Sequence, residues 1–182
     1  MSETKVVAVS CSPSVGGKTR AALEAVLAGA AALGAQTTLV EMGEHDGVQP
    51  VLDALHGAEA VVLGSPMYRG TYTAQFKTLI DAVPRGAYGD PAAPLSGRAV
   101  LTVATAGSDH HLLGPGSMRD VLADFYGSQV VAPGLYVTGA AFVDGQLAGD
   151  AADRARLMGG ALVELARAID SSTALRALTP NV

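Results

Sequence analysis

Several residue types are scarce in this chain of 182 residues, and each scarcity excludes something. A single cysteine, Cys11, rules out an internal disulfide framework and indicates a reducing compartment. Charged side chains make up only 16% of the residues, the formal net charge is −5, and lysine and arginine do not cluster. Nucleic acids and anionic membranes are therefore not expected partners.

Two further absences concern targeting. The first residues, MSETKVV, lack a basic segment followed by an apolar one, so no signal peptide is expected. The most apolar helical stretch, residues 21–35, contains Glu24 and Gly29 and is too short to span a bilayer. We therefore expect a protein of the cytoplasm that does not enter membranes.

Apolar residues, in contrast, are abundant at 49%, which suits one globular domain over residues 1–182. Short β-branched runs alternate with helical patterns along the chain. Strands are predicted at residues 5–10, 36–40, 58–64, 98–105 and 129–137. Helices are predicted around residues 23–30 (ended by Gly34), at 51–55, at 75–82, within 118–125 and at 151–169. Residues 171–182 are expected to form a loose tail.

Five strands that are each followed by a helix imply a parallel sheet with helices on both faces. Right-handed crossovers make this a three-layer, doubly wound α/β domain, and strand order 2-1-3-4-5 suits its length. Ligands of such sheets bind beyond the carboxyl ends of the strands, at the switch point between strands one and three. The loops after strands one, three and four are therefore the expected site.

The first of these loops, SCSPSVGGKTR at residues 10–20, ends like a nucleotide-binding P-loop. That pattern needs a glycine at position 12, where Ser12 stands, and Pro13 removes one N–H group from the loop. A P-loop enzyme also needs an aspartate at the end of another strand to hold magnesium. Strands three and four end instead in residues 64–66 and 105–107, without aspartate. The sequence therefore disfavours an NTPase.

The same loop still suits a phosphate that is bound without a metal. It opens a helix whose positive end favours an anion, and Lys18 and Arg20 add positive charge. Hydroxyl groups come from Ser10, Ser12, Ser14 and Thr19, and close approach of backbone amides is allowed at Gly16 and Gly17. The alternative for any single residue is an ordinary βα turn with a helix cap, which explains the whole set less well.

The other two loops suit a flat ring. After strand three, Met67, Tyr68 and Tyr72 can pack against a ring at the switch point, although the tyrosines can equally be core or interface residues. Backbone N–H groups that can meet the acceptor-rich edge of a ring come from Thr105, Ala106 and Gly107. Together the three loops can hold a phosphate, a linker and a planar heterocycle.

These stretches resemble the NAD(P)H-dependent FMN reductase family of the flavodoxin-like superfamily. The segment from Ser12-Pro13 to Thr19 is similar to the phosphate loop of that family. The most specific similarity is GSPMYRGTYTAQFKTLID at residues 64–81, and ATAGS at residues 104–108 resembles the loop after strand four. The resemblance covers about residues 5–140 and points to the branch that supplies reduced FMN to two-component monooxygenases.

The resemblance implies which residues bind FMN. The phosphate would be held by Ser12, Ser14, Lys18, Thr19 and Arg20. The ribityl chain and ring would lie along Pro66, Met67, Tyr68 and Arg69, with Tyr72 nearby. The pyrimidine edge of the ring would meet Thr105, Ala106, Gly107 and Ser108.

The implied reaction is hydride transfer from NADH or NADPH to FMN, which needs no catalytic side chain. No metal site is expected, because His110 and His111 are adjacent and no other ligand stands at suitable spacing. The implied partners are further copies of the chain, as a homodimer or homotetramer, and a monooxygenase that receives reduced FMN. The alternatives are an FMN-bound quinone or azo reductase and a flavodoxin-like electron carrier.

One stretch departs from that branch. In the branch, the helix after the strand-four loop can carry an inserted residue, often tyrosine, that makes a π-bulge at a tetramer interface. Here HHLLGPGSMRDVLADF, residues 110–125, contains no tyrosine and is one residue short of that form. Whether FMN is an exchanged substrate or a prosthetic group therefore stays open.

Overall fold

The structure is a computed structural model that describes residues 3–178 and 180. Its main sheet has the order β2-β1-β3-β4-β5, and a further strand, β6, also pairs with β4. Every strand pair of this sheet is parallel, which confirms the predicted order and the doubly wound class. The strands are β1 (Lys5–Ser10), β2 (Gln36–Glu41), β3 (Ala60–Pro66), β4 (Ala99–Ala106), β5 (Gln129–Val130) and β6 (Leu135–Thr138).

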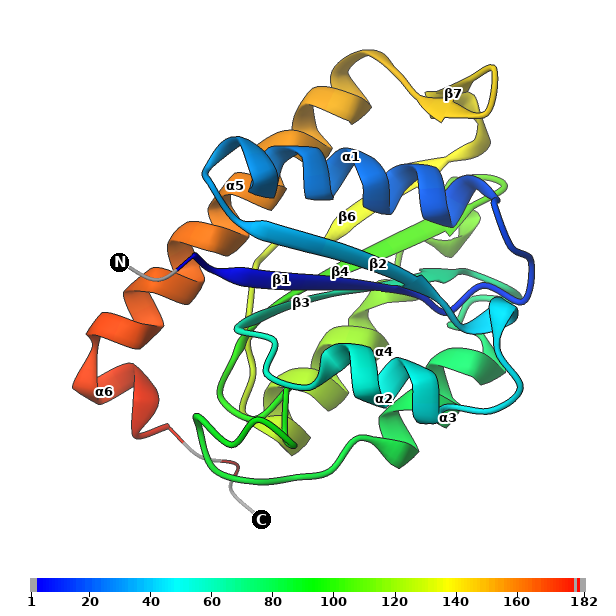
Figure 1. Cartoon of the computed structure of the whole chain (residues 1–182). Helices are drawn as coiled ribbons and strands as arrows, with labels where there is room; N and C mark the ends of the chain where they lie inside the picture. The colour runs from blue at the N-terminus through cyan, green and yellow to red at the C-terminus, as the bar shows by residue number, and fades with distance from the viewer. Residues whose placement is uncertain (1–2, 179, 181–182) are drawn as a thin grey trace.

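Helices cover both faces of the sheet, as Figure 1 shows. One face carries α1 (Lys18–Ala32) and α5 (Gly149–Ser171), and the other carries α2 (Gln49–Leu55), α3 (Ala74–Ala82) and α4 (Pro115–Asp120). Alternate residues of β1 serve the two faces: Val6 and Ala8 join the core under α1 and α5, and Val7 and Val9 join the opposite core. Burial on both faces explains why the strands are apolar runs rather than alternating patterns.

The last predicted strand, residues 129–137, is interrupted in the structure. Pro133 has no N–H group to offer a ladder, and the chain returns to β4 only at Leu135. At Gly134 an added Cβ would lie 2.4 Å from Thr102 Oγ1, so a larger residue does not fit against β4 there. The result is the pair of short strands β5 and β6 in place of one long strand.

Helices α1 and α5 pack backbone against backbone. A Cβ added to Gly29 would lie 1.9 Å from the Arg156 carbonyl oxygen, and one added to Gly159 would lie 1.9 Å from the Val26 carbonyl oxygen. Real side chains never come this close, so only glycine is compatible with the crossing. This contact fixes the carboxyl-terminal half of α1 against α5.

The helix after the strand-four loop contains a π-helical segment, η3 (Val121–Phe125). The stretch therefore forms a π-helical segment although residues 110–125 contain no tyrosine. The segment ends at Tyr126, which is fully buried and donates its hydroxyl to the carbonyl oxygens of Ile80 (2.5 Å) and Val83 (3.1 Å). The stretch considered from the sequence was only residues 110–125, and the tyrosine that anchors this segment is the next residue, Tyr126.

Several shorter elements were not predicted. A hairpin of β7 (Phe142–Val143) and β8 (Gln146–Leu147) turns at Asp144 and Gly145, both with positive φ, as a two-residue hairpin turn requires. The expected loose tail holds α6 (Thr173–Arg176), whose Leu175 packs on the core, while residues 179, 181 and 182 lie outside the described residues. The 3-10 turns are η1 (Met42–Glu44), η2 (Asp109–His111) and η4 (Gly139–Ala141). Within residues 3–178 and 180, no helix is both long and apolar enough to cross a membrane.

Candidate functional site

A pocket of about 250 Å³ opens at the carboxyl ends of β1, β3 and β4, at the predicted switch point. It brings together most of the predicted site residues and one glycine that precedes α1. Its lining consists of Ser12, Ser14, Gly17, Lys18, Thr19, Pro66, Tyr68, Thr105, Ala106 and Gly107. The arrangement is therefore the one expected for the three loops, while the role of each residue in binding stays a prediction.

The loop after β1 presents a helix start to this pocket. Gly17 is the N-cap residue of α1, and no side chain caps the first turn of the helix. The Ser12 hydroxyl accepts a hydrogen bond from the Ser14 N–H (3.1 Å), which folds the loop back on itself. The first amides of α1 thus meet the pocket without a capping side chain, and such amides bind anions readily.

A buried carboxylate that the sequence analysis missed holds the same loop from behind. Glu41, at the end of β2, is only 1% exposed, and its two oxygens accept the Gly16 N–H at 3.1 and 3.2 Å. The Gly16 amide is therefore committed to Glu41 and is not available to an anion, contrary to expectation. The sequence did offer a sign of this role, because Glu41 is a charged residue directly after the predicted strand at residues 36–40.

Arg20 is the partner of this carboxylate. Its Nη1 donates to Glu41 (2.7 Å) and its Nε donates to Glu24 (2.8 Å), and these bonds, Glu41 first, raise the pKa of Arg20. The side chain does not line the pocket. The structure thus pairs Arg20 with Glu41 outside the pocket lining, and its role as a phosphate ligand stays a prediction.

This pairing leads to a testable prediction. The Arg20→Gln variant is expected to unfold at a lower urea concentration than the Arg20→Gln/Glu41→Gln double variant, because only the single variant leaves a buried carboxylate without its cation. The double variant is expected to bind FMN as the wild type does, as measured by fluorescence quenching. A loss of FMN affinity in the double variant, with the fold intact, would instead make Arg20 a phosphate ligand.

Three threonines join the loops. The hydroxyls of Thr19 and Thr105, both buried, lie 2.9 Å apart and link α1 to the end of β4. Thr73 caps α3 by accepting the Phe76 N–H, and its hydroxyl donates to the Cys11 carbonyl oxygen at 2.6 Å. Thr73 was not predicted, although a threonine before a helical pattern is a common cap.

Lys18 is oriented by a segment that sequence reasoning overlooked. Its Nζ lies 5.6 Å from the ring centroid of Phe142, within cation–π range, and a Cβ added to Gly139 would lie 3.2 Å from that Nζ. The segment 139–142 therefore covers the ammonium group from the side. The Asp144-Gly145 turn was the only sequence sign of this hairpin.

Of the predicted residues 67–69 in the loop after β3, only Tyr68 lines the pocket. Tyr68 is 53% exposed in the pocket, and it pairs through its backbone with Thr71 across a tight turn in which Arg69 and Gly70 both have positive φ. Arg69 lies exposed on that turn and does not line the pocket. Met67 points the other way, because it is 3% exposed and packs in the core under α3 and α4.

Two more predicted residues lie outside the pocket lining. Tyr72 packs on Phe76, with ring centroids 4.6 Å apart, and faces a separate cavity between α3 and η3. The Ser108 hydroxyl lies 3.0 Å from His110 Nδ1, and the Ser108 carbonyl oxygen accepts the Tyr136 hydroxyl at 2.6 Å. Tyr136 thereby holds the loop after β4 in place.

The site holds no activated nucleophile. Cys11 is fully buried beside the loop, and burial raises the pKa of its thiol, so the thiol stays neutral. In the part of the chain that the structure describes, no three His, Cys, Asp or Glu side chains gather as metal ligands. The chemistry that the pocket offers is therefore binding: hydroxyls, amides and one ammonium group lie at the start of α1, and apolar and backbone surface lies at the ends of β3 and β4.

The sequence matches one family model and curated proteins. Residues 4–142 match the sequence model of the family described as NADPH-dependent FMN reductase. The chain is 34% identical over 91 residues to the NADH-dependent FMN reductase SfnF of Pseudomonas putida, which covers 50% of this chain and 45% of that protein. It is 30% identical over 95 residues to an FMN reductase (NADPH) of Pseudomonas aeruginosa, covering 52% and 47%. The chain thus matches about half the length of these curated relatives.

Solved structures support the fold. The apo form of an NADH:FMN oxidoreductase (EMOB) superposes with a TM-score of 0.76 at 22% identity, over 96% of this chain and 95% of that one. A flavodoxin from the domain Archaea superposes with a TM-score of 0.64 at 17% identity, over 90% and 99%. At these identities the likeness concerns the flavodoxin-like fold alone.

Proposed function

The chain belongs to the NADPH-dependent FMN reductase family, and we propose that it transfers hydride from NADH or NADPH to FMN. The observation that carries this proposal is the pocket at the switch point, which combines an uncapped helix start with serine and threonine hydroxyls. A terminal phosphate with no metal suits such donors. The donor set present therefore fits FMN.

Within this proposal, the phosphate would be bound by the hydroxyls of Ser12, Ser14 and Thr19 and by the first amides of α1, with Lys18 supplying opposite charge. Pro66 and Tyr68 would contact the ribityl chain and ring. The backbone of residues 105–107 would offer N–H groups to the pyrimidine edge, where negative charge develops on reduction. When bound, FMN supplies the hydride acceptor, and the chain's own part is to bind, orient and stabilise charge.

The predicted residues that do not line the pocket are proposed to act from positions beside it. We propose that Met67 and Ser108 act through their backbone, because the structure commits their side chains elsewhere. Arg69 and Tyr72 would border the open side of the ring, where the nicotinamide must enter. The 53% exposure of Tyr68 supports an open face at this position.

The proposal also covers the partners of the protein and its cellular location. We propose a homodimer or homotetramer, a cytoplasmic location and a flavin-dependent monooxygenase that receives the reduced FMN. Exposed apolar side chains near the loop after β4, above all Leu113 at 91%, support an interface there.

The experiment is the steady-state oxidation of NADH and of NADPH, with and without added FMN. We expect oxidation of at least one nicotinamide that rises and saturates with added FMN, which identifies FMN as an exchanged substrate. A purified protein that is already yellow and reduces quinones without added FMN would support the prosthetic alternative. Bound flavin without nicotinamide oxidation would support an electron carrier, and absence of any flavin binding would refute the whole proposal.

A further inference from the structure

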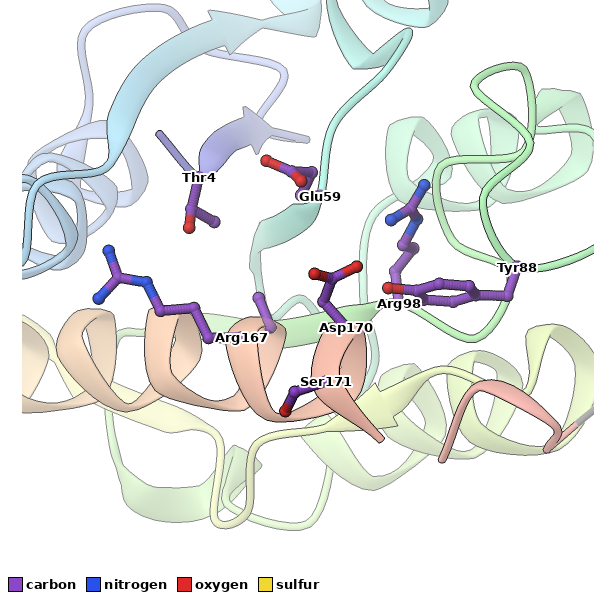
Figure 2. Close-up of a pocket in the computed structure, with 8 residues that line it drawn as sticks. Thr4, Glu59, Tyr88, Arg98, Arg167, Asp170 and Ser171 are labelled. Carbon is purple, nitrogen blue, oxygen red and sulfur yellow. The ribbon is translucent and has the colours of Figure 1, made fainter. Parts of the chain in front are cut away.

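A second cavity of about 240 Å³ lies at the opposite edge of the sheet, where the strands begin (Figure 2). Thr4, Glu59 and Arg98 directly precede β1, β3 and β4, and Arg167 and Asp170 reach the cavity from the last turns of α5. The candidate site lies at the carboxyl ends of the same strands. The two cavities are therefore separate, and a ligand of the second cavity is independent of the proposed function.

Arg98 is the group in this cavity that most needs a ligand. It is only 9% exposed, and its guanidinium lies over the Tyr88 ring, 4.6 Å from the centroid. Its side chain has no hydrogen-bond or ion-pair partner among the described residues, and its Nε is buried without one. A buried cation without an anion is costly, and a guanidinium stacked on an aromatic ring presents its edge to a planar carboxylate.

Carboxylates share the cavity without neutralising Arg98. Figure 2 shows Asp170 rising from α5 into the space below Glu59, with Arg98 and Tyr88 to one side and Arg167 to the other. Among the described residues, neither acid forms an ion pair with an arginine. Glu59 uses one oxygen to accept the Lys5 N–H (2.9 Å), which leaves the other oxygen for a ligand.

Arg167 and Ser171 each make one hydrogen bond to a backbone carbonyl, and the Arg167 Nε is buried without a partner among the described residues. Arg167 donates through Nη2 to the Leu33 carbonyl oxygen (2.8 Å), and the Ser171 hydroxyl donates to the Ala168 carbonyl oxygen (3.1 Å). Burial raises the pKa of Tyr88, so its phenol stays protonated and can donate a hydrogen bond. Among the described residues, the cavity therefore offers the Arg98 guanidinium, which has no hydrogen bond, and two carboxylates at separate positions, while Arg167 is held to Leu33 by one hydrogen bond.

We propose that this cavity binds a small zwitterion of the amino-acid type, with its carboxylate on Arg98 and its ammonium group on Asp170 and Glu59. A simple anion would satisfy Arg98 but would be repelled by both acids. A simple cation would satisfy the acids but would be repelled by Arg98. Only a molecule that carries both charges can pair with Arg98 and with the two carboxylates at once. The cavity volume limits this molecule to a small metabolite.

The test is amide chemical-shift perturbation by NMR on the full chain without flavin. The probes are the twenty L-amino acids in turn, with propionate and propylamine as half-ligands. We expect at least one amino acid to shift the amides of Glu59, Arg98 and Asp170 saturably at millimolar concentration, while neither half-ligand does so. Absence of any saturable shift at these residues refutes the site, and equal shifts from propionate refute the zwitterion.

Two variants and a control sharpen the test. Asp170→Asn and Arg98→Lys are each expected to weaken binding about tenfold or more, because each removes a charge-assisted or forked hydrogen bond. Glu164→Gln removes a negative charge from the same helix outside the cavity and should bind as the wild type does. The NMR spectrum itself reports whether each variant is folded, and Asp170, which is exposed, is the safer position. Wild-type affinity in both variants would overturn the proposal.

Discussion

Replacing Gly159 by alanine is expected to destabilise the protein by about 3 kcal/mol or more. The new Cβ would lie 1.9 Å from the Val26 carbonyl oxygen, and this neighbour is helix backbone, which cannot rotate away as a side chain can. Helices α1 and α5 must separate to admit it, which exposes apolar residues that both helices bury. Urea unfolding followed by circular dichroism measures the loss.

The next residue provides a matched control. Gly160 lies in the same helix, but the nearest atom that an added Cβ would meet outside that helix is Leu33 Cδ1, at an ordinary 3.5 Å. Gly160→Ala is therefore expected to be neutral or to stabilise by up to about 1 kcal/mol through helix propensity. Equal unfolding midpoints for the two variants would show that the helices do not meet backbone to backbone at Gly159.

The second large effect is expected at the other end of α1. Gly17→Asp should weaken FMN binding about 100-fold or more, because a carboxylate at the helix start repels the phosphate and takes its place. The side chain has room, since the nearest atom to an added Cβ is the Ser14 carbonyl oxygen at 3.9 Å. Without ligand, the variant should be as stable as the wild type or about 1 kcal/mol more so, because aspartate is a good helix cap.

Asparagine at the same position separates charge from shape. Gly17→Asn caps the helix equally well but is neutral, so it should lose much less FMN affinity than Gly17→Asp. Riboflavin, which lacks the phosphate, should bind both variants alike. Fluorescence titration with the two flavins gives the comparison. If Gly17→Asp and Gly17→Asn bind FMN equally, the phosphate does not lie at the start of α1.

The parts of the fold that were predictable are those that local sequence specifies. The β-branched run of β1 is apolar because it is buried on both faces, and its predicted bounds of residues 5–10 agree with the structure. The break in the last strand was also encoded, at Pro133 and Gly134, but its effect depends on how closely the chain approaches β4. The position of a strand such as β1 is thus specified locally, whereas the continuity of a strand depends on contacts with its neighbour.

The candidate site likewise has features that local sequence predicts and features that depend on distant residues. The place of Ser12 and Thr19 in the pocket lining was predictable, because both belong to one short loop with a recognisable pattern. The place of Arg20 could not be found, because its partner Glu41 lies 21 residues away on a neighbouring strand. Met67 and Tyr72 show a further limit: a residue within a motif can point into the core or a different cavity, and spacing alone does not give the direction.

The hydroxyl bonds between the loops have a consequence for how a ligand would bind. Thr19 joins α1 to Thr105, and Thr73 joins α3 to Cys11, so the three loops are tied to one another before any ligand arrives. Their conformational entropy is largely lost on folding and need not be lost again on association. The pocket is therefore preorganised for its ligand. Substitutions in separate loops should change the ligand affinity non-additively, because the loops share these hydrogen bonds.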